Sequence, residues 1–201
     1  MKRLKDIILI EGFRSMSSEG IRSFTVENLA SKLSMSKKTI YQYFPKKEIL
    51  IKKVIDFRMK RLTDQFNKII EDESDPIVQF IKIREHNIKF SGKLNLNRLV
   101  YLKTRYPDIW DRIEKYREDR EKIFITIFTS AKKQNLLREN LEPVTAAKIY
   151  TNIFNATFQP EFLVDKNISI DQAVNHMKVI IENGFFSDDG IKKIKDFLYK
   201  K

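Results

Sequence analysis

The amino-acid sequence predicts an all-α protein with two domains, at residues 1–46 and 47–201. Apolar residues recur at helical spacing along most of the chain, and no segment alternates like a β-strand over more than a few residues. Four of the five prolines stand where a helical pattern restarts, and the fifth marks a possible kink. They are Pro45, Pro76, Pro107, Pro143 and, at the kink, Pro160. A chain of 201 residues is long enough to bury a substantial core.

The first helix is predicted from near Leu4 to Gly20, because glycine commonly ends a helix. After the turn, Phe24 is expected to hold the chain against the core. The inner stripe of this helix consists of Leu4, Ile7, Ile8, Gly12, Phe13 and Met16.

Residues 25–44 predict two short helices around a tight turn. Thr25 is the expected N-cap of the first helix, and Ser36 that of the second. The apolar positions of the pair are Val26, Leu29, Ala30, Leu33, Met35, Ile40 and Phe44. The second helix then leaves a polar face pointing outward, made of Lys37, Lys38, Thr39, Tyr41, Gln42 and Tyr43.

That polar face has the chemistry needed to contact nucleic acid. Lysines carry charge for phosphates, threonine and tyrosine hydroxyls can bind phosphate oxygens, and Gln42 can pair with a base edge. Pro45 favours the start of a third helix, whose positive end carries Lys46 and Lys47 as a phosphate clamp. Thr25 and Ser36 complete the expected contact set. The alternative is an ordinary helical bundle with solvated lysines.

These residues resemble the TetR-type transcriptional regulators over residues 1 to about 60. The resemblance rests on Ile7-Ile8, Phe13, Met16, Glu19-Gly20-Ile21, Thr25-Val26, Leu29-Ala30, Met35-Ser36-Lys37, Thr39-Ile40-Tyr41, Tyr43-Phe44, Lys47 and Leu50. It implies an N-terminal three-helix helix-turn-helix DNA-binding domain, followed by a C-terminal helical ligand-binding and dimerisation domain. Two positions depart from the family pattern: Ser34 stands where glycine is usual, and Lys38 where a small residue is common.

Composition agrees with a polyanionic partner. The formal net charge is +12, and residues 1–50 hold ten basic and five acidic side chains, whereas residues 151–201 hold seven of each. The absence of cysteine rules out disulfides and thiolate metal sites. No signal peptide or membrane span fits the sequence, so we expect a cytoplasmic protein.

Catalytic constellations are missing from the sequence. The two histidines lie far apart, no glycine-rich phosphate loop occurs, and no cluster has metal-ligand spacing. We therefore expect no enzyme, no cofactor and no metal; the alternative is a helical enzyme whose carboxylate site is assembled only in the folded chain.

The second domain is predicted to be helical throughout. Its first helix, residues 46–71, connects the second domain to the two short helices at residues 25–44. A tilt of this helix would move those two helices. The alternative is that the helix only spans the two domains. Further helices are expected at residues 75–91, ending at Gly92, then at 94–106, 107–134 and 143–164. The last two helices are expected to begin after Ser169 and after Ser187.

Two arginines lie on faces that the pattern turns inward, Arg84 and Arg117. An unpaired buried charge is costly, so each needs a partner. One possibility is an internal ion pair, Arg117 with Glu121 or Arg84 with an acid on a neighbouring helix. The other is an effector site for an amphipathic anion, and His86 is alternatively a core histidine. The expected effector site consists of Arg84, His86, Tyr101, Trp110 and Arg117.

Two strongly apolar helices near the C-terminus indicate a homodimer interface, as the resemblance also implies. The alternative is that both stripes only complete the internal core. The predicted interface consists of Phe154, Phe158, Phe162, Ala173, Val174, Met177, Ile180 and Ile181.

Together these features predict a homodimeric, ligand-responsive regulator that binds a palindromic operator in double-stranded DNA, with repression as the expected sign. The alternative is a ligand-independent DNA organiser or co-regulator whose second domain binds a protein. A large cavity in the second domain would favour the first function, and a closed core the second.

Overall fold

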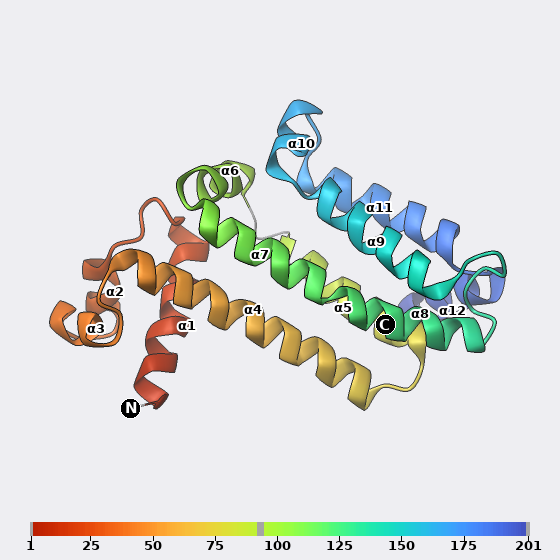
Figure 1. Ribbon diagram of the computed structural model, residues 1–201, viewed down its shortest axis with the longest axis horizontal. Helices are drawn as coiled ribbons and strands as arrows, with labels where there is room; N and C mark the ends of the chain where they lie inside the picture. Colours follow the sequence, from red (N-terminus) through yellow and green to blue (C-terminus); the bar gives the residue numbers. More distant parts are fainter. Residues whose placement is uncertain (1, 92–94, 200–201) are drawn as a thin grey trace. The chain divides into compact units, whose positions relative to one another are not determined.

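The computed structural model describes residues 2–91 and 95–199 and is all-α over that part of the chain (Figure 1). Apart from helices, the described residues contain one isolated bridge, between Leu137 and Phe186. The helices are α1 (Lys2–Glu19), α2 (Val26–Lys32), α3 (Lys37–Tyr43), α4 (Lys47–Asp72), α5 (Pro76–Ser91), α6 (Leu96–Arg105), α7 (Pro107–Asp119), α8 (Glu121–Lys133), α9 (Pro143–Thr157), α10 (Pro160–Asp165), α11 (Ile170–Phe185) and α12 (Asp188–Tyr199).

The chain forms two compact units. Unit 1 consists of Met1–Leu62 and Asn97–Ile113, and unit 2 of Thr63–Leu96 and Glu114–Lys201. Helices α4 and α7 therefore each contribute one part to unit 1 and the other to unit 2. The predicted boundary at residue 46, between a DNA-binding domain and an effector-binding and dimerisation domain, stays a prediction.

In unit 1, α1 packs closely against α4 and ends where predicted. A Cβ atom at Gly12 would lie 2.8 Å from Val54 Cγ2, so the glycine permits this approach. Gly20 has φ +88°, a left-handed conformation that glycine adopts without strain. One predicted core position is wrong: Ile7 is 41% exposed, because it shares the polar side of the helix with Arg14.

Unit 2 is built around a cluster of aromatic rings. Phe124 and Tyr150 have ring centroids 4.4 Å apart, and those of Phe80 and Phe186 are 4.9 Å apart. Phe128 contacts several of these rings, and Phe185 joins from α11. The cluster joins α5, α8, α9 and the end of α11 into one core, in which aromatic pairs add stability beyond their buried area.

Two helices predicted as continuous are broken. The segment 107–134 forms α7 and α8 with a break at Arg120, where the charged run from Arg117 to Lys122 offers no apolar residue to continue the buried stripe. The segment 143–164 forms α9 and α10, because Pro160 lacks an N–H group and ends the helix before it. The expected helix end at Gly92, and the start of the next helix at Leu94, lie outside the described residues.

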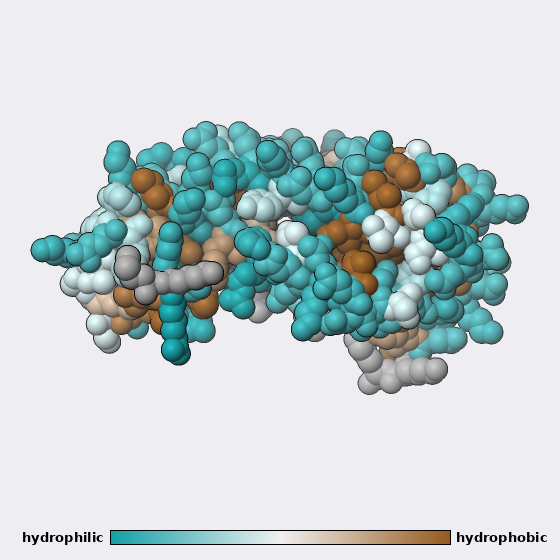
Figure 2. Space-filling model, turned by 60° about the horizontal axis from the view of Figure 1, so that its bottom comes forward, coloured by the Kyte–Doolittle hydropathy of each residue, from teal (hydrophilic) through white to brown (hydrophobic). Residues whose placement is uncertain are grey.

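Most of the molecular face drawn in Figure 2 is hydrophilic, and its hydrophobic atoms form small separate areas. Among the described residues, no helix is both long and apolar enough to cross a membrane. In the same residues, no group of three or more potential metal ligands comes together.

Candidate nucleic-acid interface

The turn between α2 and α3 is fixed by backbone geometry. Ser34 has φ 52°, and its N–H donates to Ser31 O at 3.1 Å. The N–H of Met35 donates to Ala30 O at 2.9 Å, which completes a Schellman motif. Glycine would adopt this conformation at about 1–2 kcal/mol lower cost than serine. The turn therefore forms in this sequence despite the unfavourable residue.

Both predicted N-caps are confirmed. Thr25 Oγ1 accepts a hydrogen bond from Asn28 N at 3.1 Å, and Ser36 Oγ accepts one from Thr39 N at 3.0 Å. Each bond satisfies a backbone donor that a helix start leaves free. Ile40 is fully buried and holds α3 against the core of unit 1.

The remaining face of α3 is open to solvent. Its exposed side chains are Lys37, Lys38, Tyr41 and Gln42, and its half-buried ones are Thr39 and Tyr43. Lys46 is exposed before the start of α4, and Lys47 is half-buried in its first turn. The structure thus brings the sequence-predicted contact residues to the surface of one helix-turn-helix element and the helix start that follows it.

One of these lysines is already paired. Lys37 Nζ donates to Glu27 Oε1 at 2.5 Å, and both side chains are exposed. The hydrogen bond from Lys37 lowers the pKa of the Glu27 carboxyl, and the charge of Lys47 contributes in the same direction. The same bond raises the pKa of the Lys37 ammonium. A carboxylate therefore stands within the otherwise basic face.

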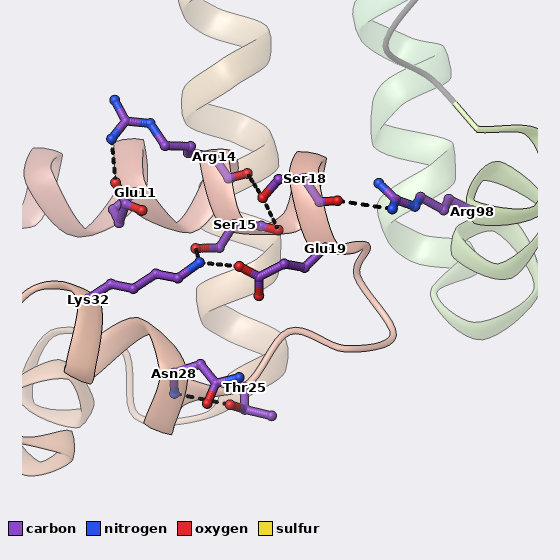
Figure 3. A network of polar contacts seen from close by, with 9 residues as sticks. All are labelled: Glu11, Arg14, Ser15, Ser18, Glu19, Thr25, Asn28, Lys32 and Arg98. Carbon is purple, nitrogen blue, oxygen red and sulfur yellow. Dashed lines mark hydrogen bonds and ion pairs between the residues drawn. The ribbon is translucent and has the colours of Figure 1, made fainter.

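A polar network holds the end of α1 in place (Figure 3). Lys32 on α2 donates to Ser15 Oγ at 3.1 Å and pairs with Glu19. Arg98 on α6 donates to the carbonyl oxygens of Ser17 at 2.6 Å and Ser18 at 3.0 Å. Arg98 therefore occupies backbone acceptors that a helix C-terminus leaves open. Sequence reasoning missed Arg98, since its partners lie about eighty residues away and are backbone atoms.

A second arginine links α7 to α4 within unit 1. Arg112 Nε and Nη2 each lie 2.7 Å from Asp56 Oδ1. The ion pair therefore holds together the parts of α4 and α7 that belong to unit 1.

The five side chains predicted to line an effector site belong to different units, so the predicted site stays a prediction. Tyr101 and Trp110 belong to unit 1, where Trp110 is buried beneath Lys103. Arg84 in unit 2 forms an ion pair with Glu182 on α11. His86 is exposed, with its ring edge toward Phe66, so the expectation of a core histidine is wrong.

Arg117 lies elsewhere in unit 2, at a small cavity of about 10 Å³. A space of this size holds about one water molecule. The lining residues are Arg117, Arg120, Phe124, Tyr150, Thr151, Phe154 and Asn155. Sequence reasoning assigned only Arg117 to this site, because the break at Arg120 that turns the second arginine inward was not predicted.

The predicted dimer residues divide by exposure. Ile180 is 62% exposed and Phe162 is 40% exposed, whereas Phe158, Ala173 and Ile181 are buried within the chain. Phe154, Val174 and Met177 are half-buried. Val179, which the sequence did not single out, is 58% exposed beside Ile180.

Comparison with known proteins gives consistent matches. Residues 8–54 match the family described as bacterial regulatory proteins, tetR family. The HTH-type transcriptional regulator YvaF of Bacillus subtilis is 25% identical over 183 residues, which cover 90% of this chain and 95% of that protein. Many solved structures share the fold, and two of them serve as examples. A transcriptional regulator from Saccharomonospora viridis in complex with choline has a TM-score of 0.70 at 16% identity, covering 93% of this chain and 100% of that one. A TetR transcription regulator from Haloarcula marismortui has a TM-score of 0.67 at 12% identity, with the same coverage of both chains.

Proposed function

This chain belongs to the TetR family of transcriptional regulators, and on that premise we propose that it is a homodimeric repressor released from a palindromic operator by a small molecule. The observation that carries the proposal is the exposed polar face of α3, held by the Ser36 cap and the buried Ile40. The proposal assigns the chain no catalytic activity and sets its action in the cytoplasm, with the DNA.

In the proposed complex, α3 of each protomer enters a major groove. Gln42 and Lys38 read base edges, because glutamine pairs with adenine and lysine with guanine. Thr25, Thr39, Tyr41 and Tyr43 bind phosphates through their hydroxyls, together with Ser36, Lys37, Lys46 and Lys47. The dimer would set the two α3 helices about 34–36 Å apart, one turn of DNA.

A second copy of the chain would cover the apolar side chains that α10 and α11 expose. These side chains are Phe162, Val164, Val179 and Ile180, and covering them removes apolar surface from water. We propose α9 to α11 as the dimer interface, in which Phe158, Ala173 and Ile181 support the surface from inside the chain.

Unit 2 is the proposed effector-binding part. The relative from Saccharomonospora viridis was solved with choline, which supports a small-molecule site in this fold. The effector is proposed to bind more tightly to dimers in which the two α3 helices are not one turn of DNA apart. Such an effector would lower operator affinity through linkage.

One observation favours a second candidate, a ligand-independent DNA-binding co-regulator whose unit 2 binds a protein. The cavity at Arg117 has room for about one water, which is less than a small molecule needs. A small-molecule effector that binds at this cavity would therefore have to enlarge it.

Selection of bound sequences from random DNA tests the DNA-binding part of the proposal. We expect a palindrome with two half-sites. Gln42→Ala or Lys38→Ala should change the preferred bases, whereas Lys47→Ala should weaken all sequences alike and reduce the salt slope by about one. An unchanged preference in both Gln42→Ala and Lys38→Ala would remove these two residues from base reading.

Release from the selected operator then separates the two candidates. Fractions of cell extract below and above the size of small metabolites are added to the complex, and operator binding is followed by fluorescence anisotropy. Release by the small-molecule fraction supports the repressor, and release by the protein fraction alone supports the co-regulator.

A further inference from the structure

The first two turns of α1 carry two basic side chains that the proposed DNA contacts do not include. Arg3 and Lys5 are both exposed, and the first turn of the helix contains no acidic residue. Among the residues that the structure describes, neither side chain forms an ion pair. Two positive charges therefore stand on the surface of unit 1 without a carboxylate bound to them.

Other cations of α1 and α2 are neutralised within the chain (Figure 3). Arg14, in the second half of α1, donates to Glu11 at 2.9 Å, and Lys32 on α2 pairs with Glu19. These ion pairs give each charge a partner in the free protein. The two cations at the start of α1 lack such a pair, so their charge is available to a partner outside the chain.

The position of Lys5 connects this end of α1 to the helix-turn-helix. Its Nζ lies 5.8 Å from the centroid of the Phe44 ring. Phe44 is buried at the end of α3, where its N–H donates to Ile40 O at 2.9 Å, and Lys46 follows two residues later. Two residues span at most about 7 Å of chain. The Lys5 ammonium therefore lies close to the junction between α3 and α4, where the proposed phosphate clamp begins.

The contact with Phe44 leaves the Lys5 ammonium able to bind an anion. A cation over an aromatic face keeps its charge, and an ammonium has three N–H donors. Lysine stems commonly lie along apolar surface while the charged group stays in water. Phe44 therefore orients Lys5 without using its hydrogen-bonding capacity.

We propose that Arg3 and Lys5 are further DNA-binding residues, which bind backbone phosphates next to those bound by Lys46 and Lys47 and contact no base. The inference rests on the DNA-binding part of the proposed function and needs neither an effector nor repression. Duplex DNA presents one charge for about every 3.4 Å along each strand, so neighbouring phosphates can serve both groups of cations. Phosphate contacts fix the protein on the duplex, whereas contacts in the grooves select the sequence.

Salt titrations of operator binding test the proposal. The probe is a fluorescent duplex with the sequence selected from random DNA, and anisotropy is measured between low and moderate salt. Arg3→Met and Lys5→Met should each make the slope of log K against log salt shallower by about 0.9 for each protomer bound, and weaken binding about eightfold per contact at about 0.1 M salt. Both variants should select the same bases as wild type, because phosphates carry no sequence information. Wild-type slopes in both variants would overturn the proposal.

Arg14→Met is the matched control. It removes the same charge from an exposed side chain of α1, but this arginine is paired with Glu11, so the slope should stay at the wild-type value. Lys5→Arg keeps the charge and should also keep the slope. An equal reduction of the slope in Arg14→Met would show a general effect of net charge and overturn the assignment. A weaker Lys5→Met with an unchanged slope would limit Lys5 to packing on Phe44 and contradict its phosphate contact.

Neutral phosphates locate the contacts on the wild-type protein. Operator duplexes are made in which one phosphate at a time is replaced by an uncharged methylphosphonate. At a contacted position this replacement should weaken the wild type but have no further effect on the variant whose cation binds there. If Lys5→Met does not fold, Arg3→Met decides, since Arg3 is exposed and its replacement removes no ion pair. Equal losses in wild type and variants at every phosphate would contradict the proposal.

Two further outcomes separate this inference from its alternatives. A wild type that prefers no sequence would refute the proposed operator, and slopes on a random duplex would still decide the role of Arg3 and Lys5, because non-specific binding also depends on phosphates. Vesicles of anionic phospholipid provide a different polyanion. Vesicle binding that depends on Arg3 and Lys5, together with unchanged DNA slopes in the variants, would assign both residues to a membrane surface and overturn the proposal.

Discussion

At the scale of single residues, the proposed DNA-binding face of α2 and α3 contains a negative charge next to its lysines. Glu27 on α2 accepts a hydrogen bond from Lys37 and lies within the electrostatic reach of Lys47. In the free protein this carboxylate neutralises a lysine that would otherwise face a phosphate. If Lys37 contacts a phosphate, DNA binding breaks this exposed ion pair, which contributes little free energy in water. If the ion pair stays intact, Glu27 repels the phosphates and weakens binding.

Glu27→Gln should therefore strengthen operator binding and steepen its salt dependence. The variant frees Lys37 for a phosphate, so the slope of log K against log salt should become more negative by about 0.9. Anisotropy titrations between low and moderate salt measure both effects. Glu71→Gln makes the same charge change at an exposed position of α4 in unit 2 and should leave the slope unchanged. An identical slope in wild type and Glu27→Gln would mean that Lys37 does not contact DNA.

At the scale of helices, the start of α5 depends on one carboxylate. Asp75 accepts hydrogen bonds from Ile77 N at 2.8 Å and Val78 N at 3.4 Å, and Lys193 on α12 donates to its other oxygen at 2.9 Å. Burial alone raises the pKa of Asp75, but the bonds from Lys193 and the two backbone groups outweigh it. The net result is a pKa below the ordinary value, so the ionised form is favoured in the folded state.

The stability of unit 2 should therefore decrease in acid through Asp75. A depressed pKa contributes stability that is present above the unfolded value, about 3.9, and is lost as pH falls through the folded pKa. Asp75→Asn keeps an N-cap but not the charge, so its unfolding free energy should fall less steeply below about pH 4 than that of wild type. Asp75→Ala also loses the cap and should cost about 1 kcal/mol at neutral pH. Urea unfolding at several pH values measures this, and parallel curves for wild type and Asp75→Asn would contradict it.

The sequence was sufficient for elements that local chemistry determines. The caps at Thr25 and Ser36 form as predicted, and Ser169, which precedes a predicted helix, makes a full capping box with Gln172. The break at Arg120 could not be predicted in this way. The charged run there has no proline or glycine, and only tertiary packing selects the point where the helix direction changes.

The predicted effector residues illustrate a different limit. An inward position on a helix indicates burial, but it does not identify the neighbour across the core. Arg84 meets Glu182, which lies 98 residues later, and Trp110 is buried in unit 1 rather than in unit 2.

At the scale of the whole molecule, the proposed dimer depends on which side of α11 faces out. The apolar stripe of this helix is wider than the chain itself can cover. Ile181 is 3% exposed, whereas its neighbour Ile180 is 62% exposed. Sequence periodicity groups the two residues, because consecutive positions lie only about 100° apart on a helix. In the structure, Ile181 packs inside the chain, whereas Ile180 would be covered only by a second copy of the chain.

Ile180→Glu should therefore yield a folded monomer, because it places a charge where the partner would bury an apolar side chain. Sedimentation should give the mass of one chain at micromolar concentration, and operator binding should be lost, since one short α3 helix makes too few contacts alone. Tyr199→Glu alters a residue that is 88% exposed at the end of α12 and should remain dimeric.

Ile181→Glu provides the complementary result. It buries a charge inside the chain, so unit 2 should unfold rather than dissociate, and circular dichroism should report the loss of helix. A dimeric Ile180→Glu variant with intact operator binding would rule out this face of α11. The interface would then have to lie on other exposed apolar residues of unit 2, such as Ile149 on α9.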